Sequence, residues 1–232
     1  MADVAEAHAH PHSPHLAHQF EDMGQQRATA SLGMWTFLAT EVMFFGGMFA
    51  AYCIYRFTNP DAFALACRHL SWKLGSLNTA VLLSSSLTVA LAVHAGQTGD
   101  RKGQVRYLML TIVLGLAFLG IKAVEYWTEF EDHLVPFWNF SVTALHAPAD
   151  ASERTLKQAE MFFVFYFFMT GLHAFHMIIG IGVFIAVAAM AERGRFTPEY
   201  HTPLELSGLY WHFVDVVWVF LYPLLYLIDL HK

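Results

Sequence analysis

Five long apolar runs alternate with shorter polar segments along this chain of 232 residues. A bilayer core about 30 Å thick is crossed by about 20 helical residues, because an α-helix rises about 1.5 Å per residue. The pattern therefore predicts an all-α fold, a polytopic membrane protein built as a bundle of five transmembrane helices. The fourth run exceeds the length of a perpendicular span, so we expect it to tilt or to project beyond the membrane. The predicted spans are 32–54, 74–96, 107–127, 161–191 and 206–228.

Residues 1–30 form a polar segment without an apolar core, so we expect no cleavable signal peptide and a first span that itself directs insertion. We interpret the segment as a solvated leader, with a metal-binding or pH-sensing tail as the alternative. The chain then divides into a polar His-rich tail, 1–30, and a five-helix transmembrane domain, 31–232. The histidines of the tail are His8, His10, His12, His15 and His18.

Composition agrees with the membrane assignment. Hydrophobic residues make up 56% of the chain and charged residues 14%, whereas about 25% of a typical soluble domain is charged. The net charge of −6 argues against a nucleic-acid partner. Two cysteines, Cys53 and Cys67, are too few for a disulfide framework and lack the spacing of metal ligands.

The charge pattern also bears on orientation. Lys and Arg are evenly divided between the two sides of the predicted bundle, but they are denser in the short loops on the N-terminal side. The long connection 128–160 on the opposite side is rich in acidic residues. The positive-inside rule then favours a cytoplasmic N-terminus. With five spans, the C-terminus lies outside.

Two carboxylates lie in the middle of predicted spans. Glu41 falls in the first span, and Asp215 falls in the fifth, three residues after His212. Inserting an acidic residue at the centre of a membrane helix costs about 2.5–3.5 kcal/mol, so such a residue needs a partner or a proton. We expect a buried hydrogen-bond network in which Glu41 and Asp215 are paired with histidines, or protonated.

The fourth span carries two further histidines, His173 and His176, on a polar stripe that should face the bundle interior. Their i, i+3 spacing can place two imidazoles on one metal. For a haem, which needs axial ligands on facing helices, His212 could oppose His173 or His176. A transition-metal or haem site is therefore an alternative to the hydrogen-bond network. No Cys cluster or Glu-x-x-His motif completes a metal site, so the network is preferred and no metal is expected.

Charged residues near the ends of the third span suggest contacts with lipid or a partner. Lys122, Glu125 and Tyr126 fit equally an intrahelical pair near the membrane boundary and a site for a head group or a partner protein. Arg101, Lys102 and Arg106 precede the span and are suited to an anionic head group of the cytoplasmic leaflet. We expect at least one ordered phospholipid along these helices.

Small residues at four-residue spacing predict close helix packing. Gly46 and Ala50 repeat in this way in the first span, and Ser84, Thr88 and Ala92 do so in the second. These faces should pack on protein.

The spans together resemble subunit III of the haem–copper terminal oxidases, in a five-helix bacterial form. The similarity covers almost all of residues 31–230, and its stretches occur in family order. Many relatives have seven helices, and this chain lacks the first two, which makes the transfer of lipid-contact residues less direct. The matching stretches are TEVMFFGGMFAAY, LNTAVLLSSSLTVALA, KAVEY, FYFFMTGLHAFHMIIG and YWHFVDVVWVFLYPLLY.

The resemblance implies a non-catalytic subunit of a cytochrome c oxidase, located in the bacterial cytoplasmic (inner) membrane. Family members carry no haem or copper, which belong to the partner subunits I and II. Subunit III contacts subunit I, binds phospholipid, and supports proton uptake and sustained turnover. Glu41, His173, His176, His212 and Asp215 match the intramembrane polar positions of the family.

Two other classes of function remain open from the residues. A related subunit accompanies some quinol oxidases and nitric oxide reductases, and a motif in subunit II, not in this chain, distinguishes the electron donor. A stand-alone proton or solute carrier could use Glu41 and Asp215. The lack of inverted repeats and of helices broken by Gly or Pro argues against a carrier.

Overall fold

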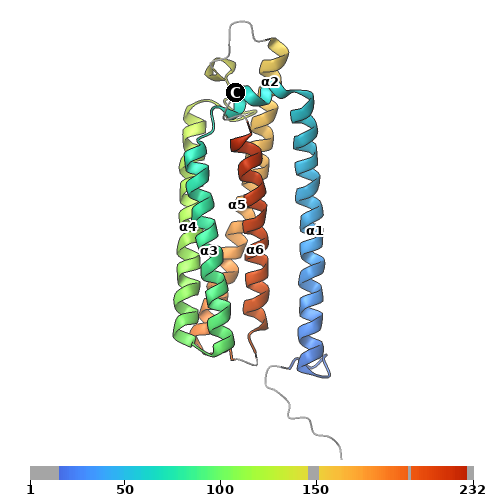
Figure 1. Ribbon diagram of the computed structural model, residues 1–232, viewed down its shortest axis with the longest axis vertical. Helices are drawn as coiled ribbons and strands as arrows, with labels where there is room; N and C mark the ends of the chain where they lie inside the picture. The colour runs from blue at the N-terminus through green and yellow to red at the C-terminus, as the bar shows by residue number, and fades with distance from the viewer. Residues whose placement is uncertain (1–15, 146–151, 198–199, 229–232) are drawn as a thin grey trace, which may run out of the picture.

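The computed structural model describes residues 16–145, 152–197 and 200–228, and this part of the chain is helical, with no strand. Five long helices run alternately up and down side by side (Figure 1). All five are long and apolar enough to cross a membrane, which confirms the predicted spans and the all-α class. The elements are α1 (Met23–Thr58), α2 (Pro60–Cys67), α3 (Trp72–Thr98), α4 (Arg101–Glu131), η1 (Val142–Leu145), α5 (Glu153–Glu192), α6 (Thr202–Tyr222) and η2 (Pro223–Leu227).

The helices extend beyond the apolar runs that predicted them. α1 begins at Met23, before the expected boundary at residue 31, because Asp22 caps its first turn by accepting a hydrogen bond from the Gln25 amide at 2.7 Å. α5 contains 40 residues, which corresponds to about 60 Å of helix and so to about twice the hydrocarbon thickness. The expected projection of this helix beyond the membrane follows from its length.

The short helix α2 was not predicted, because its eight residues are too few to register as a span. Pro60 starts it in the first turn, where a missing amide hydrogen costs nothing. Phe63 is fully buried and contacts Phe162 of α5, with ring centroids 5.6 Å apart. The Cys67 thiol donates to the Leu225 carbonyl at 3.0 Å. α2 therefore covers one end of the bundle (Figure 1).

Close packing at the centre depends on glycines facing a tryptophan. Trp211 of α6 is fully buried between Gly115 of α4 and Gly180 of α5. A β-carbon at either glycine would lie 2.9 Å from the indole ring, which is closer than van der Waals contact. The Trp211 ring nitrogen donates to the Ser85 hydroxyl of α3 at 3.0 Å, so this one side chain joins four helices.

The small-residue faces have two different outcomes. Thr88 of α3 is buried and shares a 2.7 Å hydrogen bond with Thr111 of α4, as close helix packing requires. At Gly46 and Gly47 of α1, by contrast, a β-carbon would meet nothing within 4 Å, so that face is not packed within the described part of this chain. α1 lies along one side of the bundle and contacts chiefly α6 (Figure 1).

The Trp211 contact generates a test of the packing. Gly180→Val should lower the free energy of unfolding by about 1–3 kcal/mol, because the added methyl groups overlap the buried indole. Gly182→Val is a matched control two residues along the same helix, where a β-carbon meets open space. Thermal unfolding in mild detergent measures both variants, and equal destabilisation by the two would contradict the packing argument.

Candidate functional site

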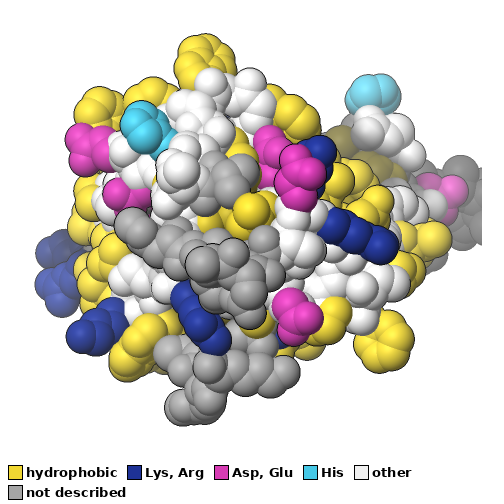
Figure 2. Space-filling model, turned by 90° about the horizontal axis from the view of Figure 1, so that it is seen from above, with side chains coloured by type: hydrophobic (Ala, Val, Ile, Leu, Met, Phe, Trp, Pro, Cys, Tyr) yellow, Lys and Arg dark blue, Asp and Glu magenta, His cyan; other side chains and the backbone are white. Residues whose placement is uncertain are grey.

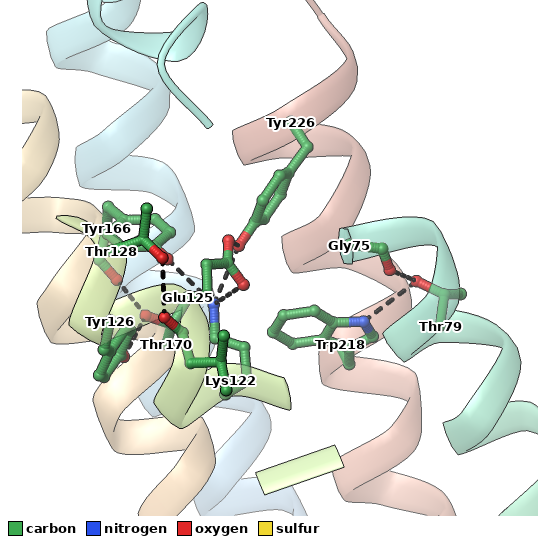
Figure 3. A network of polar contacts seen from close by, with 11 residues as sticks. Gly75, Thr79, Lys122, Glu125, Tyr126, Thr128, Tyr166, Thr170, Trp218 and Tyr226 are labelled. Carbon is green, nitrogen blue, oxygen red and sulfur yellow. Dashed lines mark hydrogen bonds and ion pairs between the residues drawn. The ribbon is translucent and has the colours of Figure 1, made fainter. Parts of the chain in front are cut away.

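The most extensive buried polar cluster surrounds Lys122 of α4 (Figure 3). Its amino group donates to Glu125 Oε2 at 3.0 Å, to the Tyr166 hydroxyl at 3.1 Å and to the Tyr226 hydroxyl at 2.9 Å. The Tyr226 hydroxyl in turn donates to Glu125 Oε1 at 2.5 Å. These four side chains are buried and come from α4, α5 and η2, so the cluster links segments far apart in the sequence.

Aromatic rings complete the surroundings of the Lys122 amino group. It lies 4.9–5.7 Å from the ring centroids of Tyr126, Tyr166, Trp218 and Tyr226, within the range of cation–π attraction. Trp218 extends the cluster to α3 by donating to the Thr79 hydroxyl at 3.1 Å (Figure 3). The Lys122 amine is thus held inside the bundle by hydrogen bonds, one carboxylate and π faces.

The sequence left two interpretations of Lys122, Glu125 and Tyr126. The intrahelical pair is present, but Lys122 and Glu125 are each only 3% exposed. Their low exposure favours the intrahelical pair, and the contact with a head group or a partner protein stays a prediction. Tyr126 is partly buried and bonds through its hydroxyl to Thr170 at 2.6 Å. The three side chains face the bundle interior because their partners lie on α5 and η2.

Sequence reasoning missed Glu129 in the same region. It is buried, two turns along α4 from Lys122, and its Oε2 has no hydrogen-bond partner in the described part of the chain. The spacing of Lys122, Glu125 and Glu129 at i, i+3 and i+7 places all three on one helix face. That periodicity was the sequence signal that could have identified Glu129 as part of the cluster.

A second polar contact joins α1 to α5. Glu41 Oε2 lies 3.2 Å from His176 Nε2, and His176 Nδ1 lies 2.9 Å from the Leu172 carbonyl. Since a carbonyl only accepts, Nδ1 carries the hydrogen. The contact at Nε2 then requires a proton on either the imidazole or the carboxylate. This geometry agrees with the expectation that Glu41 is paired with a histidine.

Asp215 has a different environment from the one expected. It is buried in α6, and neither carboxylate oxygen makes a hydrogen bond to the described residues. The Ser86 hydroxyl bonds to His212 Nδ1 at 2.7 Å. Asp215 is therefore not paired with a histidine among the described residues, because His212 turns toward α3, and the alternative of a protonated Asp215 stays a prediction.

His173 is likewise apart from the other histidines. Its ring packs against Phe118 and Trp218, with centroids 5.5 and 5.2 Å away, and neither ring nitrogen has a hydrogen-bond partner among the described residues. His176 points to α1, although it lies on the same helix. Within the described ranges, no three His, Cys, Asp or Glu side chains are grouped as metal ligands. The histidines of the tail other than His18 lie outside those ranges.

The opposite end of the molecule has two cavities with basic side chains. Arg101, Lys102 and Arg106 of α4 line a cavity of about 490 Å³ together with Val105 and Glu192. Arg101 also donates through Nε to the Ala191 carbonyl at 3.2 Å, which fixes the start of α4 against the end of α5. The structure therefore brings the three predicted basic residues together.

A second cavity, of about 540 Å³, lies between α1, α3 and α6. Arg27, Ser31, Glu205 and His212 contribute polar groups to its lining, among apolar side chains of α3 and α6. Sequence reasoning missed this cavity, since its lining comes from three helices.

The Lys122 cluster generates a double-mutant test. Lys122→Met should lower the free energy of unfolding by about 3–5 kcal/mol, because it leaves the buried Glu125 without its charge partner. Adding Glu125→Gln should recover part of that loss. Lys73→Met, at an exposed lysine of α3, is the control and should change little. Unfolding in mixed micelles is measured for the parent chain, Lys122→Met, Glu125→Gln, the double variant and the control. Effects of the two single substitutions that simply add in the double variant would contradict a coupled pair.

Comparison with known proteins agrees with the resemblance noted in the sequence. Residues 21–133 and 150–229 match the family described as cytochrome c oxidase subunit III. The chain is 34% identical to cytochrome c oxidase subunit 3 of Corynebacterium diphtheriae over 201 residues, 86% of this chain and 88% of the relative. It is 30% identical to the Thermostichus vulcanus subunit 3 over 198 residues, with 85% and 86% covered.

The match to a carp relative covers a smaller share of the relative than of this chain. The Cyprinus carpio subunit 3 is 34% identical over 202 residues, which cover 84% of this chain but 67% of the relative. Bacterial and vertebrate relatives therefore match nearly the whole five-helix bundle, and the helices with the family assignment indicate a multi-pass inner-membrane protein. The chain belongs to the cytochrome c oxidase subunit III family.

Proposed function

We propose that this chain is the non-catalytic subunit III of a bacterial haem–copper terminal oxidase that uses cytochrome c. The observation that carries the proposal is the match to a bacterial oxidase subunit along 86% of this chain and 88% of the relative. In this proposal haem and copper belong to partner subunits I and II, and this chain carries neither. Its role is to contact subunit I, to bind phospholipid, and to support proton uptake and sustained turnover.

The surface of α1 supports the proposed contact with a neighbouring subunit or lipid. Gly46 and Gly47 leave an open face, and large apolar side chains such as Met43 next to them are exposed. Small residues permit close approach of another helix in a membrane. This face is therefore available to a transmembrane helix of subunit I or to lipid chains packed at that interface.

The basic cavity at the start of α4 supports the proposed phospholipid. Its three cationic side chains suit a phosphate, and each basic residue near an anionic membrane surface contributes about 1 kcal/mol to attraction. Binding there requires this end of the molecule to face the cytoplasm, as the denser positive charge of the N-terminal side favours. The proposed orientation accordingly has the N-terminus inside and the C-terminus outside.

The two acids in the middle of membrane-spanning helices support an auxiliary role in proton supply. Glu41 is held by His176, whereas Asp215 is isolated from hydrogen-bond partners in the described structure. The two acids lie on different helices and have separate surroundings. We propose that they aid packing and proton supply and do not form an obligatory proton channel.

Purification tests the assignment. The tagged chain, extracted in mild detergent, should bring with it a haem-bearing subunit and phospholipid. The chain expressed alone should show no haem absorbance, because its proposed cofactors belong to the partners. A visible spectrum and phosphorus analysis of the two preparations measure this. A haem spectrum from the isolated chain, or a haem-free preparation from its native membrane, would overturn the proposal.

Substitution of the acids tests their role. Glu41→Gln and Asp215→Asn should leave most of the initial rate of oxygen reduction and of proton pumping, while shortening activity over many turnovers. Oxygen consumption over time and proton release from vesicles measure these quantities. Arg193→Gln, at an exposed position, is a control for substitution in this chain. Complete loss of pumping in a fully assembled, spectrally normal complex would place the acids on the main proton path.

A further inference from the structure

The loop that follows α4 presents two aromatic side chains to solvent. We call residues 132–141 the aromatic loop. Phe137 is 89% exposed and its neighbour Trp138 is 84% exposed. Trp127 and Phe130 at the end of α4 are also exposed, with ring centroids 6.4 Å apart. Trp127 and Phe130 end a membrane-spanning helix, where aromatic residues are common at the membrane interface. Phe137 and Trp138 follow in the loop, and large exposed aromatic residues are uncommon on a surface that contacts only water.

The backbone of the aromatic loop adopts conformations that these residues rarely take. His133 has a φ of 56° and Phe137 a φ of 62°, and neither is glycine. A bulky residue with positive φ is strained, and such strain persists where the surroundings enforce it, often at sites that bind something. At Phe137 the strained residue is also the exposed aromatic residue.

Hydrogen bonds from within the loop enforce this shape. Asn139 donates through Nδ2 to the Phe130 carbonyl at 2.7 Å and accepts from the Val135 amide at 3.2 Å. The Ser141 amide donates to the His133 carbonyl at 2.9 Å. Leu134 is buried in the core and anchors the loop. The aromatic pair is therefore held in place before any partner arrives, which reduces the entropy lost on binding.

Charge distinguishes between a membrane surface and a protein as the occupant. Exposed Glu131 and Asp132 lie at the start of the loop, and the segment 123–145 contains neither Lys nor Arg. Segments that bind anionic lipid surfaces carry basic residues beside their aromatic ones, which is the opposite pattern. The basic side chains seen at this end of the molecule therefore come from other segments (Figure 2). Acidic residues beside exposed aromatic ones suit a protein surface of positive charge.

We propose that the aromatic loop is a docking site for another protein outside the membrane, on the side of α2. The partner surface has a hydrophobic pocket that receives Phe137 and Trp138 and a border of Lys and Arg that faces Glu131 and Asp132. Tryptophan in a central pocket is a frequent source of binding energy in protein interfaces. This proposal does not depend on the assignment of the chain to a particular oxidase.

Site-specific photocrosslinking in intact cells tests the proposal. Benzoylphenylalanine in place of Phe137 keeps an aromatic side chain at the tip of the loop. The expected product is an adduct with one protein, mapped by mass spectrometry to an apolar site bordered by Lys or Arg. Adducts with phospholipid only, with a second copy of this chain, or with no molecule at all would overturn the proposal.

Variants separate docking from mere proximity. Trp138→Ala should lower the yield of that adduct at least tenfold, and so should Glu131→Lys combined with Asp132→Lys. Phe57→Ala is the matched control, because Phe57 is equally exposed near the end of α1 on the same side. The yield of the adduct from the Phe57→Ala variant should stay within twofold of the yield from the parent chain. All variants change exposed side chains, and equal amounts of folded chain are confirmed by thermal unfolding. An adduct yield unchanged by the Trp138 and charge variants would overturn the proposal.

Discussion

A polar group inside a bilayer must find its partner within protein, because lipid chains offer neither donors nor acceptors. The Lys122 cluster meets this constraint by joining α4 to α5 and η2, and Trp218 extends it to α3 and α6. The cluster constrains how these helices are arranged, because displacement of one of them would leave Lys122 or Glu125 without a partner. The packing of Trp211 against two glycines adds a steric constraint among the same helices.

The described polar groups fall into two kinds. Lys122, Glu125, Tyr166 and Tyr226 satisfy one another by hydrogen bonds, although Glu129 beside them keeps one oxygen without a partner in the described structure. Asp215 and His173 are buried without hydrogen-bond partners in the described structure. Buried unpaired polar groups are rare in proteins, and each calls for an explanation such as a bound water, a proton or a neighbouring molecule. The first kind constrains how the helices pack, because removing one partner would leave another buried polar group unpaired.

The sequence predicted the membrane-spanning helices well, because hydropathy over about 20 residues is a strong local property. Sequence reasoning missed α2, because its eight residues are apolar but too few to register as a membrane span. For the candidate site, local spacing correctly gave the Lys122–Glu125 pair. It could not show that Tyr166 and Tyr226 converge on that pair from distant segments. The pairing of Asp215 with His212 was not found for the same reason: His212 is close in sequence, but its side chain points toward Ser86 on another helix.

The position of α1 has a consequence for how the chain is made. Its contacts with later segments span long stretches of sequence: 135 residues separate Glu41 from His176, and 172 separate Tyr52 from the Leu224 carbonyl to which it donates. At translation rates of about 5–20 residues per second, roughly 7–27 s pass between the synthesis of Glu41 and that of His176. During biogenesis Glu41 is therefore a carboxyl group in the membrane without its eventual partner. Insertion of this helix must accommodate that interval by protonation, by water or by shelter within the insertion machinery.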